Sequence, residues 1–308
     1  MNASADGRSR SAARSVEPGS AEFLARACHE AADRVAEARR REPLEDLRAR
    51  ALGTPAPAPF GAALTGGVIA EVKRASPSRG VIAADRDANA QARAYLAGGA
   101  AAVSVLTEPR HFLGSLVDLH TVASAVRLPV LRKDFVVDAY QVVEARAAGA
   151  AAVLLLVAAL DHGPLVDLLH VAREVGVEAL IETHDADDIA RATAAIAEVT
   201  WDRAPVVGVN ARDLRRLSVD RARVTDLIDL VPDDAVVVAE SGVSGPADVA
   251  AYVQAGADAV LVGEHLMRAD DPEVATHALA TAARAAHRAR PARAVRSARD
   301  TPAMPDPS

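Results

Sequence analysis

The sequence predicts an α/β protein in which eight parallel strands alternate with helices and close into a (β/α)8 barrel. Short apolar runs rich in β-branched residues recur eight times from residue 68 onward, with starts 22 to 33 residues apart. The stretches between them have helical periodicity, as in ANAQARAYLAGG and DADDIARATAAIA. Runs that are apolar on both faces and alternate with helices are typical of a parallel sheet covered by helices, and eight such units form a barrel. No GxGxxG follows the first run, so an open doubly wound sheet is the less favoured alternative.

The expected elements follow in chain order. Residues 21–51 place apolar side chains at helical spacing and contain Pro43, so we expect two helical pieces, followed by a Pro/Ala-rich linker, TPAPAPFGAAL. The predicted strands are 68–74, 101–108, 129–135, 151–158, 178–184, 205–213, 235–242 and 259–266. Several helices between them end in Ala-Gly-Ala, where the glycine caps the helix C-terminus. We expect one domain over 21–287, with a helical extension over 21–60, and disordered tails at the aperiodic ends, 1–20 and the basic, Pro-rich 288–308.

Composition and charge restrict the class of protein. The chain has 308 residues, 50% of them hydrophobic and 25% charged, which is typical of a globular protein with a large core. No apolar run reaches the roughly 18 residues that a membrane span needs, and a net charge of −7 argues against a nucleic-acid binder. The single cysteine, Cys28, fits a reducing compartment, and no apolar segment follows the first arginines as a secretory signal requires. We expect a cytoplasmic protein that acts on a small molecule, without nucleic acid or membrane partners, as a monomer or weak homodimer.

Lysine usage singles out two positions. Of the 35 basic residues 33 are arginine, and the only lysines are Lys73 and Lys133. Arginine keeps its proton near neutral pH, whereas burial can lower the pKa of a lysine from about 10.4 so that it acts as an acid, a base or a nucleophile. Both lysines fall at the C-terminal ends of predicted strands, where barrels of this kind carry their active sites. Two lysines left on the surface by drift would be the alternative.

Other polar side chains gather at the same strand ends. In chain order they are Glu71, Glu108, Asp134, Glu182, His184, Asn210, Arg212, Glu240, Ser241 and Glu264. Glu71 lies two residues before Lys73, so both side chains face the same side of their strand. So many charges in an apolar barrel would be costly without a ligand, although ion pairs that merely fill the barrel would use the same residue types. We expect these groups to form one catalytic pocket.

Glycines after the last two strands predict a phosphate site. Ser241-Gly242 and Gly263-Glu264 follow the seventh and eighth strands, whose loops commonly bind phosphate in barrels through backbone N–H groups. Ordinary turns would also use glycine at these positions. Ser76, in the loop after the first strand, either adds a hydroxyl to this site or belongs to a simple Ser-Pro turn.

Aromatic and metal-binding signals are weaker. Only 3% of the chain is aromatic, and Phe112 and Phe135 lie at strand ends or just beyond, where they either join the core or form walls for a flat apolar substrate group. The nine histidines are scattered, no HExxH or paired Cys/His spacing occurs, and of the histidines only His184 lies at a strand end. Ser241 lacks the GxSxG surroundings of a nucleophile elbow. We expect neither a metal ion nor Ser/His/Asp catalysis.

Taken together, these residues resemble the indole-3-glycerol phosphate synthase family. The similarity covers about 21–287 and is strongest in IAEVKRASPSRG, SVLTEPRHFLGS, VLRKDFVVDAYQVVEARAAGA, GVNARDL, AESGVSG and LVGEHLM. The Glu-x-Lys-x-x-Ser-Pro-Ser and Lys-Asp-Phe segments are specific in combination, because neighbouring phosphate-binding barrels share the glycines but not this set. Two positions depart from the family pattern, Ala211 where asparagine is usual and Thr183 where valine is usual. Neither departure removes a catalytic residue type.

The resemblance implies a TIM barrel with an additional N-terminal helical segment over the C-terminal face, and no metal or cofactor. The implied reaction, that of a carboxy-lyase, converts 1-(2-carboxyphenylamino)-1-deoxyribulose 5-phosphate to indole-3-glycerol phosphate, carbon dioxide and water. Lys133 would protonate the ribulose carbonyl, and Lys73 would pair with the substrate carboxylate and donate a later proton, although the order of the two lysines stays open. Glu182 would accept a proton or stabilise charge, and Glu71 would orient Lys73. Substrate hydroxyls and the ring carboxylate would be held by Asn210, Arg212 and Ser241, with Glu240 in support. The phosphate would be contacted by Ser76, Gly242, Gly263 and the backbone of Glu264.

The implied reaction needs the residue types that are present. Protonating a carbonyl near neutral pH calls for a cationic acid with a lowered pKa, decarboxylation restores aromaticity without a cofactor, and dehydration needs one more acid and base. A related sugar-phosphate isomerase would need a Cys/Asp or Asp/Asp pair, which these strand ends lack. A retired copy serving as a scaffold would have lost one of Glu71, Lys73, Lys133 and Glu182, and all four are present. A secondary-metabolism duplicate with the same chemistry would carry the same residues.

Overall fold

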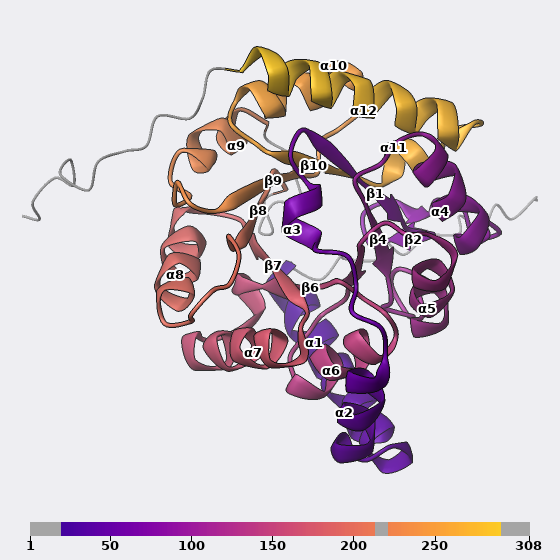
Figure 1. Cartoon of the computed structure of the whole chain (residues 1–308), viewed down its shortest axis with the longest axis vertical. Helices are drawn as coiled ribbons and strands as arrows, with labels where there is room; N and C mark the ends of the chain where they lie inside the picture. Colours follow the sequence, from indigo (N-terminus) through magenta and orange to yellow (C-terminus); the bar gives the residue numbers. More distant parts are fainter. Residues whose placement is uncertain (1–19, 213–220, 291–308) are drawn as a thin grey trace, which may run out of the picture.

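The eight predicted strands form a closed barrel (Figure 1). The computed structural model describes residues 20–212 and 221–290. The strands of the barrel are β1 (Gly67–Val72), β4 (Ala102–Leu106), β5 (Val130–Lys133), β6 (Ala152–Leu156), β7 (Glu178–Thr183), β8 (Val206–Asn210), β9 (Val236–Glu240) and β10 (Ala259–Val262). Their order around the barrel is β1-β10-β9-β8-β7-β6-β5-β4, and the neighbouring pairs are parallel. The predicted (β/α)8 fold is confirmed, and each strand begins within one residue of its predicted start.

Helices connect the strands and cover the outside of the barrel. They are α4 (Ala88–Ala97), α5 (Leu116–Ala125), α6 (Ala139–Ala147), α7 (His162–Val175), α8 (Ala186–Ala197), α9 (Arg221–Ile228), α10 (Pro246–Gln254), α11 (Glu264–Met267) and α12 (Pro272–Ala289), with a 3-10 turn, η1 (Val157–Ala159), after β6. Five of them have a capping side chain that accepts a backbone N–H, namely Asp87, Ser115, Asp138, Asp185 and Asp271. Each such cap contributes about 1 kcal/mol and fixes where the strand-end loop stops.

From residue 20, where the described structure begins, the segment before the barrel contains three helices. α1 (Ser20–Arg41) and α2 (Leu44–Gly53) lie on either side of Pro43, as expected, and the linker predicted to follow them contains a short helix, α3 (Phe60–Ala63). A small hairpin, β2 (Ala75–Ser76) with β3 (Gly80–Val81), follows β1. The predicted domain boundary at residue 287 falls inside α12, and the predicted tails lie almost wholly outside the described residues.

An apolar plug closes the N-terminal end of the barrel. Phe60 and Leu64 are fully buried and pack with interior strand residues such as Ile69, Leu131 and Leu180. Figure 1 shows α3 lying across this end. A second apolar layer, which contains more of the described residues than the plug does, lies between the barrel and the surrounding helices. The barrel interior is therefore filled from one end, so a cavity can open only at the other.

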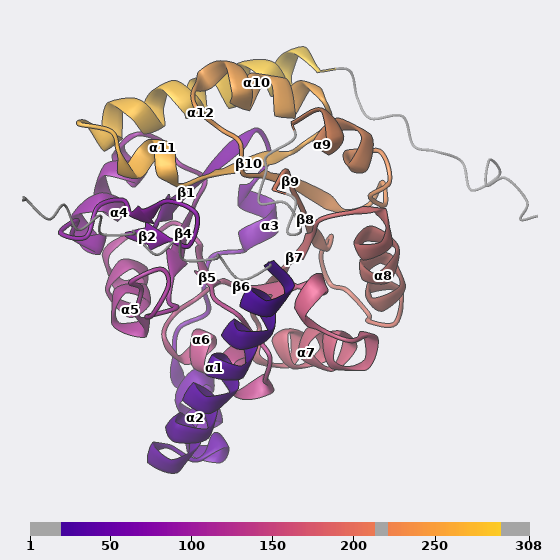
Figure 2. The ribbon, with the colours of Figure 1, turned by 180° about the vertical axis from the view of Figure 1, so that it is seen from behind.

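The helix α1 lies at that other, C-terminal end, as expected. Figure 2 shows its N-terminal turns near the centre of the barrel and its remainder running outward past α6. Among the described residues no helix is long and apolar enough to cross a membrane.

Candidate active site

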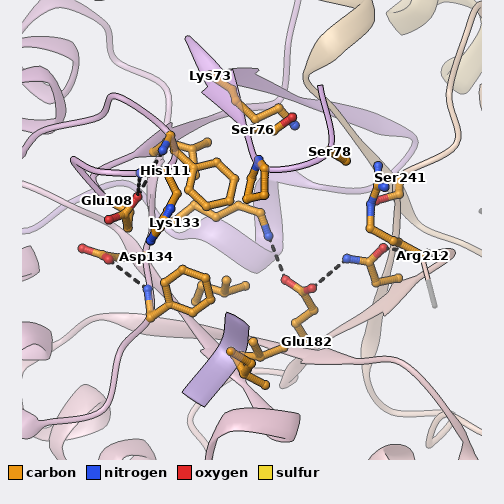
Figure 3. Close-up of a pocket in the computed structure, with 18 of the residues that line it drawn as sticks. Lys73, Ser76, Ser78, Glu108, His111, Lys133, Asp134, Glu182, Arg212 and Ser241 are labelled. Carbon is orange, nitrogen blue, oxygen red and sulfur yellow. Dashed lines mark hydrogen bonds and ion pairs between the residues drawn. The ribbon is translucent and has the colours of Figure 1, made fainter. Parts of the chain in front are cut away.

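The C-terminal ends of the strands surround a cavity of about 360 Å³ (Figure 3). Eleven of the predicted site residues line it, namely Glu71, Lys73, Ser76, Phe112, Lys133, Phe135, Glu182, Asn210, Arg212, Ser241 and Glu264. The other three, Glu240, Gly242 and Gly263, lie outside the lining. Glu240 nevertheless accepts from Lys133, and Gly263 lies next to the side chains of Glu71 and Lys73. The barrel topology thus brings together residues from seven strands that are spread over about 190 positions of the chain.

The strand β1 supplies the first ion pair. Glu71 belongs to β1 and Lys73 follows its last residue, so strand alternation turns both side chains to the cavity. Lys73 Nζ lies 2.6 Å from Glu71 Oε1, and the Glu71 side chain is buried. A Cβ atom on Gly263 would overlap Glu71 Oε1 and lie 3.0 Å from Lys73 Nζ. Besides its expected contact with phosphate, Gly263 therefore leaves the space that this ion pair fills.

A second cluster surrounds Lys133 at the end of β5. Its Nζ donates to Glu182 Oε2 at 2.8 Å and to Glu240 Oε2 at 3.0 Å, and Figure 3 shows the lysine and Glu182 pointing toward each other across the cavity. The second oxygen of Glu240, Oε1, is buried without a hydrogen-bond partner among the described residues. A Cβ on Gly208 would overlap that oxygen. The glycine in β8 therefore makes room for a carboxylate from β9.

The surrounding carboxylates keep Lys133 charged. Burial by itself lowers the pKa of Lys133, but attraction to Glu182, Glu240 and then Glu71 outweighs burial, so the pKa lies above its ordinary value. The expectation that the cationic acid of this site has a lowered pKa is therefore wrong for Lys133. Closure of the barrel brings carboxylates from β7 and β9 within 3.0 Å of the ammonium, and strand-end spacing in the sequence gives no measure of that convergence.

The two carboxylates share Lys133 unequally. Burial raises the pKa of Glu182, but the charges of Lys133 and His184 outweigh burial and hold it below its ordinary range. For Glu240, burial and the like charge of Glu182 raise the pKa to about 7 in spite of Lys133. Two carboxylates that cannot both ionise freely around one ammonium form a group that holds an exchangeable proton near neutral pH.

Aromatic rings form one side of the cavity. The Phe112 and Phe135 ring centroids are 6.3 Å apart, and Phe23 of α1 lies 6.0 Å from Phe135. Leu106 and Leu156 from β4 and β6 also contribute to the lining. This side therefore suits a flat apolar group. Phe23 was not predicted as a site residue, because the apolar stripe of an N-terminal helix looks the same whether it packs on a core or on a substrate cavity.

Serine and arginine side chains form another side, and Figure 3 shows Arg212 and Ser241 across the cavity from His111 and Asp134. Ser241 has φ 69° and Gly242 has φ 77°, so two consecutive residues are left-handed. A left-handed serine is strained, and such strain is characteristic of functional turns. Burial, and after it the charge of Arg79, lowers the pKa of Arg212. A guanidinium group, that of Arg212, beside a serine-containing turn favours an anion at this side of the cavity.

Ion pairs hold α1 against the loops after β4 and β5. Glu30 accepts from Arg110 Nη1 at 2.7 Å and lies 3.0 Å from His111 Nε2. Arg34 donates to Asp134 Oδ1 at 2.9 Å. Glu108 accepts the backbone N–H groups of residues 110, 111 and 112. Glu30, Glu108 and His111 are close enough to share a metal ion, but the donors already on these oxygens suit a latch between helix and loop.

Several cavity residues had no predicted role, although Glu108, Asp134 and His184 were expected in the pocket as polar strand-end residues. The residues without a predicted role are Phe23, Leu24, Arg26, Pro77, Ser78, Leu106, Glu108, His111, Asp134, Leu154, Leu156 and His184. Glu108, Asp134 and His184 had a detectable signal, because they are polar residues at predicted strand ends. The strand leucines, Leu106, Leu154 and Leu156, had none, since strand residues that point into a barrel and those that line its mouth are equally apolar.

The fold and the cavity together define a (β/α)8-barrel enzyme built for acid–base chemistry on a small molecule, with lysine–carboxylate clusters, an aromatic side and an arginine–serine side. The chain belongs to the indole-3-glycerol phosphate synthase family, whose pattern it matches over residues 24–279. The resemblance inferred from the sequence motifs is confirmed, and so is the enzyme class, since this activity is that of a carboxy-lyase.

Curated relatives are similar over most of their length. An indole-3-glycerol phosphate synthase from Kineococcus radiotolerans is 55% identical over 215 residues, covering 70% of this chain and 76% of the relative. The enzyme of the same name from Streptomyces griseus is 48% identical over 251 residues, covering 80% of this chain and 91% of the relative. That from Mycolicibacterium smegmatis is 50% identical over 242 residues, covering 78% and 86%.

Solved structures with the same architecture are more distant in sequence. A 3-hexulose-6-phosphate synthase from Salmonella typhimurium has a TM-score of 0.56 at 15% identity, covering 70% of this chain and 98% of that one. A thiamine phosphate pyrophosphorylase from Pyrococcus furiosus has a TM-score of 0.52 at 16% identity, covering 71% and 95%. At such identities the similarity supports the barrel fold alone.

Proposed function

We propose that this chain converts 1-(2-carboxyphenylamino)-1-deoxyribulose 5-phosphate to indole-3-glycerol phosphate, carbon dioxide and water, the ring-closing step in tryptophan biosynthesis. One observation carries the proposal. The only two lysines of the chain each form an ion pair with a carboxylate at one cavity, between an aromatic side and an arginine–serine side. That arrangement matches a substrate with an aromatic ring at one end and a phosphate at the other.

Substrate orientation follows from the two sides. The carboxyphenyl ring lies among Phe23, Phe112 and Phe135, where its faces contact apolar rings. The phosphate lies toward Arg212 and the Ser241-Gly242 turn, and its remaining expected contacts are Ser76, Gly263 and the Glu264 backbone. This orientation leaves the ribulose carbonyl in the middle of the cavity, within reach of the lysines.

Ring closure begins with Lys133. The ring carbon that bears the carboxylate attacks the ribulose carbonyl carbon, and the Lys133 ammonium gives a proton to the carbonyl oxygen as the new bond forms. The high pKa of Lys133 keeps it cationic across the working range. Glu240, with a pKa raised to about 7, can return a proton to the lysine directly, since its Oε2 lies 3.0 Å from Nζ.

Decarboxylation and dehydration complete the reaction. The electrons of the bond to the carboxylate return to the ring as carbon dioxide leaves, and the restored aromaticity makes a cofactor unnecessary. Lys73, oriented by Glu71, then protonates the leaving hydroxyl, while Glu182 accepts the proton lost as the indole forms. Asn210 donates to Glu182 Oε1 at 2.7 Å, so it helps to orient this base as well as substrate hydroxyls.

The test is a fluorescence assay for indole-3-glycerol phosphate, with EDTA present and no metal added, on the wild type and on Lys133→Arg. Arginine keeps the charge but cannot give up its proton at working pH, so we expect wild-type turnover and a loss of about 10²–10⁴-fold in the variant. An active variant would reduce Lys133 to an electrostatic contact. A wild type that binds the substrate without turning it over would favour a retired scaffold.

We also propose the setting in which the enzyme works. The acidic net charge of −7 and the lack of a predicted disulfide partner for Cys28 support a cytoplasmic enzyme with no nucleic-acid or membrane partner. A monomer or weak homodimer suffices, because every group in the proposed mechanism comes from one chain. Gel filtration over a range of concentrations tests the oligomeric state.

A further inference from the structure

The imidazole of His184 is buried between two carboxylates beside the cavity. Its Nε2 lies 3.2 Å from Glu182 Oε1, and its Nδ1 lies 3.7 Å from Asp188 Oδ2 of helix α8. The side chain is only 6% exposed. Within the described residues neither ring nitrogen makes a hydrogen bond of good geometry, so the two contacts become ion pairs when the imidazole is protonated. A buried polar ring in this position needs an explanation, and the reaction steps described above do not use it.

The main chain of His184 is held from both sides. Its N–H donates to Asp188 Oδ2 at 3.0 Å, and its carbonyl accepts from Arg223 Nη2 of helix α9 at 2.8 Å. Asp188 is fixed in turn, because its own N–H donates to the Asp185 cap. The ring is therefore carried on a backbone anchored to two helices, which lets it resist movement of the carboxylate in front of it.

Glu182 needs such a fixed neighbour. Its other contacts are Lys133 on Oε2 and Asn210 on Oε1, and both are expected to engage the substrate during the proposed reaction. Each contact weakens when its residue turns to the substrate. His184 touches the same oxygen as Asn210 and is tied to the protein through Asp188, so it remains when the other two contacts change.

We infer that His184 is a positioning residue, and that its imidazolium holds the carboxylate of Glu182 with Oε2 directed at Lys133. This inference rests on the proposed function. A neutral imidazole has one N–H, so it would present a lone pair to one of its two flanking carboxylates, whereas an imidazolium donates toward both. The charges facing the ring are Glu182 from β7 and Asp188 from α8. Arg191 lies 3.6 Å from Asp188, and Arg223 donates to the His184 carbonyl.

The electrostatics agree with that geometry. Burial lowers the pKa of His184, but attraction to the close carboxylates of Asp188 and Glu182 outweighs burial and raises it to about 9 from an ordinary 6.5. Because the folded pKa is the higher one, the stabilisation from the imidazolium is fully present below pH 6.5 and is lost as the pH rises through about 9. The orientation of Glu182 should weaken over the same interval.

The test compares His184→Gln with His162→Gln by steady-state kinetics from pH 6 to 10. His162 is a matched control, because it also forms an ion pair, to Glu198 at 2.6 Å, but is half exposed and outside the cavity. We expect His184→Gln to lower kcat by about 10- to 100-fold with little change in KM, since a misplaced base slows chemistry without loosening the substrate. The wild type should also lose activity above about pH 9, and His184→Gln should lack that decline.

A second variant and a spectroscopic readout separate the possible failures. Asp188→Asn removes one flanking charge, so the alkaline decline should move to lower pH, and ¹⁵N NMR of the histidine ring should report the same shift without any turnover. Wild-type kcat and an unchanged pH profile in His184→Gln would overturn the positioning role alone. An inactive wild type would overturn the proposed function and the positioning role with it. If His184→Gln fails to fold, an unmoved decline in Asp188→Asn overturns the inference.

Discussion

The two ends of the barrel treat their carboxylates in opposite ways. At the N-terminal end, Glu178 meets the plug helix α3, and its two oxygens accept the N–H groups of Phe60 and Gly61 at 2.8 and 2.9 Å. At the C-terminal end, Glu240 shares an ammonium with Glu182 and leaves one oxygen without a partner in the described structure. A satisfied carboxylate stabilises, whereas an unsatisfied one is ready to exchange a proton or a partner. The difference separates the end that holds the fold from the end that performs the chemistry.

Phe60→Ala tests the comparison at the N-terminal end of the barrel, where α3 forms the apolar plug. Truncating a fully buried phenylalanine leaves a cavity inside the barrel, and we expect unfolding to become easier by about 3–5 kcal/mol. Urea unfolding measures this, with Leu52→Ala, at an exposed position of α2, as the control. Well below its midpoint the variant should keep wild-type kcat, because α3 lies at the far end. A large fall in kcat under those conditions, where the variant is still folded, would show that the two ends are coupled.

Gly263→Ala tests the comparison at the C-terminal end of the barrel. The added methyl group would overlap Glu71 Oε1 and displace Glu71 and Lys73 together, so we expect kcat to fall by about 100-fold. The control is Gly163→Ala in α7, where nothing in the described structure lies within 4 Å of the new Cβ. Circular dichroism before the assay establishes that both variants are folded. Equal kcat values for the two variants would mean that the Glu71–Lys73 ion pair does not need the space left by Gly263.

Glu240→Gln sharpens the electrostatic contrast. The pKa of Glu240 is raised from 4.5 to about 7, so its contribution to stability is present below pH 4.5 and is lost as the pH rises through 7. A neutral amide avoids that loss. We expect the variant to be more stable than wild type at pH 9, by about 1 kcal/mol or more, and not at pH 4.5.

Urea unfolding at the two pH values checks this prediction, with the exposed Glu273→Gln as control. A variant less stable than wild type at pH 9 would show that pairing with Lys133 outweighs the burial of the second carboxylate.

Glu30→Gln has the smallest expected effect. It weakens the partly exposed pairs from α1 to Arg110 and His111, and such pairs contribute little. We expect KM to rise by roughly two- to fivefold with kcat unchanged, because Phe23 of the same helix would contact the aromatic ring less often. Glu37→Gln, on the same helix but paired with the exposed Arg41, should match the wild type. A fall in kcat without a change in KM would give α1 a role in catalysis beyond closing the cavity.

The periodic parts of the fold could be predicted from the sequence. Strand starts were correct to within one residue, because each strand is a β-branched run between helical periods. The helix α3 could not be predicted, since its four residues, Phe60–Ala63, are too few to show a period and follow prolines typical of a linker. Its role depends on Glu178, more than 100 positions away, and no local pattern contains that contact.

The candidate site was accessible for a different reason. Rare lysines at strand ends identify a cavity regardless of the loop conformations, since the barrel brings all strand ends together. Contacts across the cavity could not be predicted in the same way. The pKa of Lys133 depends on how closely Glu240 approaches, and that approach depends on Gly208 in a neighbouring strand. Phe23 required knowing where an extra helix docks.

The pairing of β1 with both β4 and β10 also constrains the order of events on the ribosome. About 190 residues separate Lys73 from Gly263, and synthesis at about 5–20 residues per second needs roughly 10–40 s to cover them. During that interval one edge of β1 has no neighbour, so water still reaches the Glu71–Lys73 pair. Closure of β1 against β10, and with it the full exclusion of water from this ion pair, therefore comes only after the last strand has emerged.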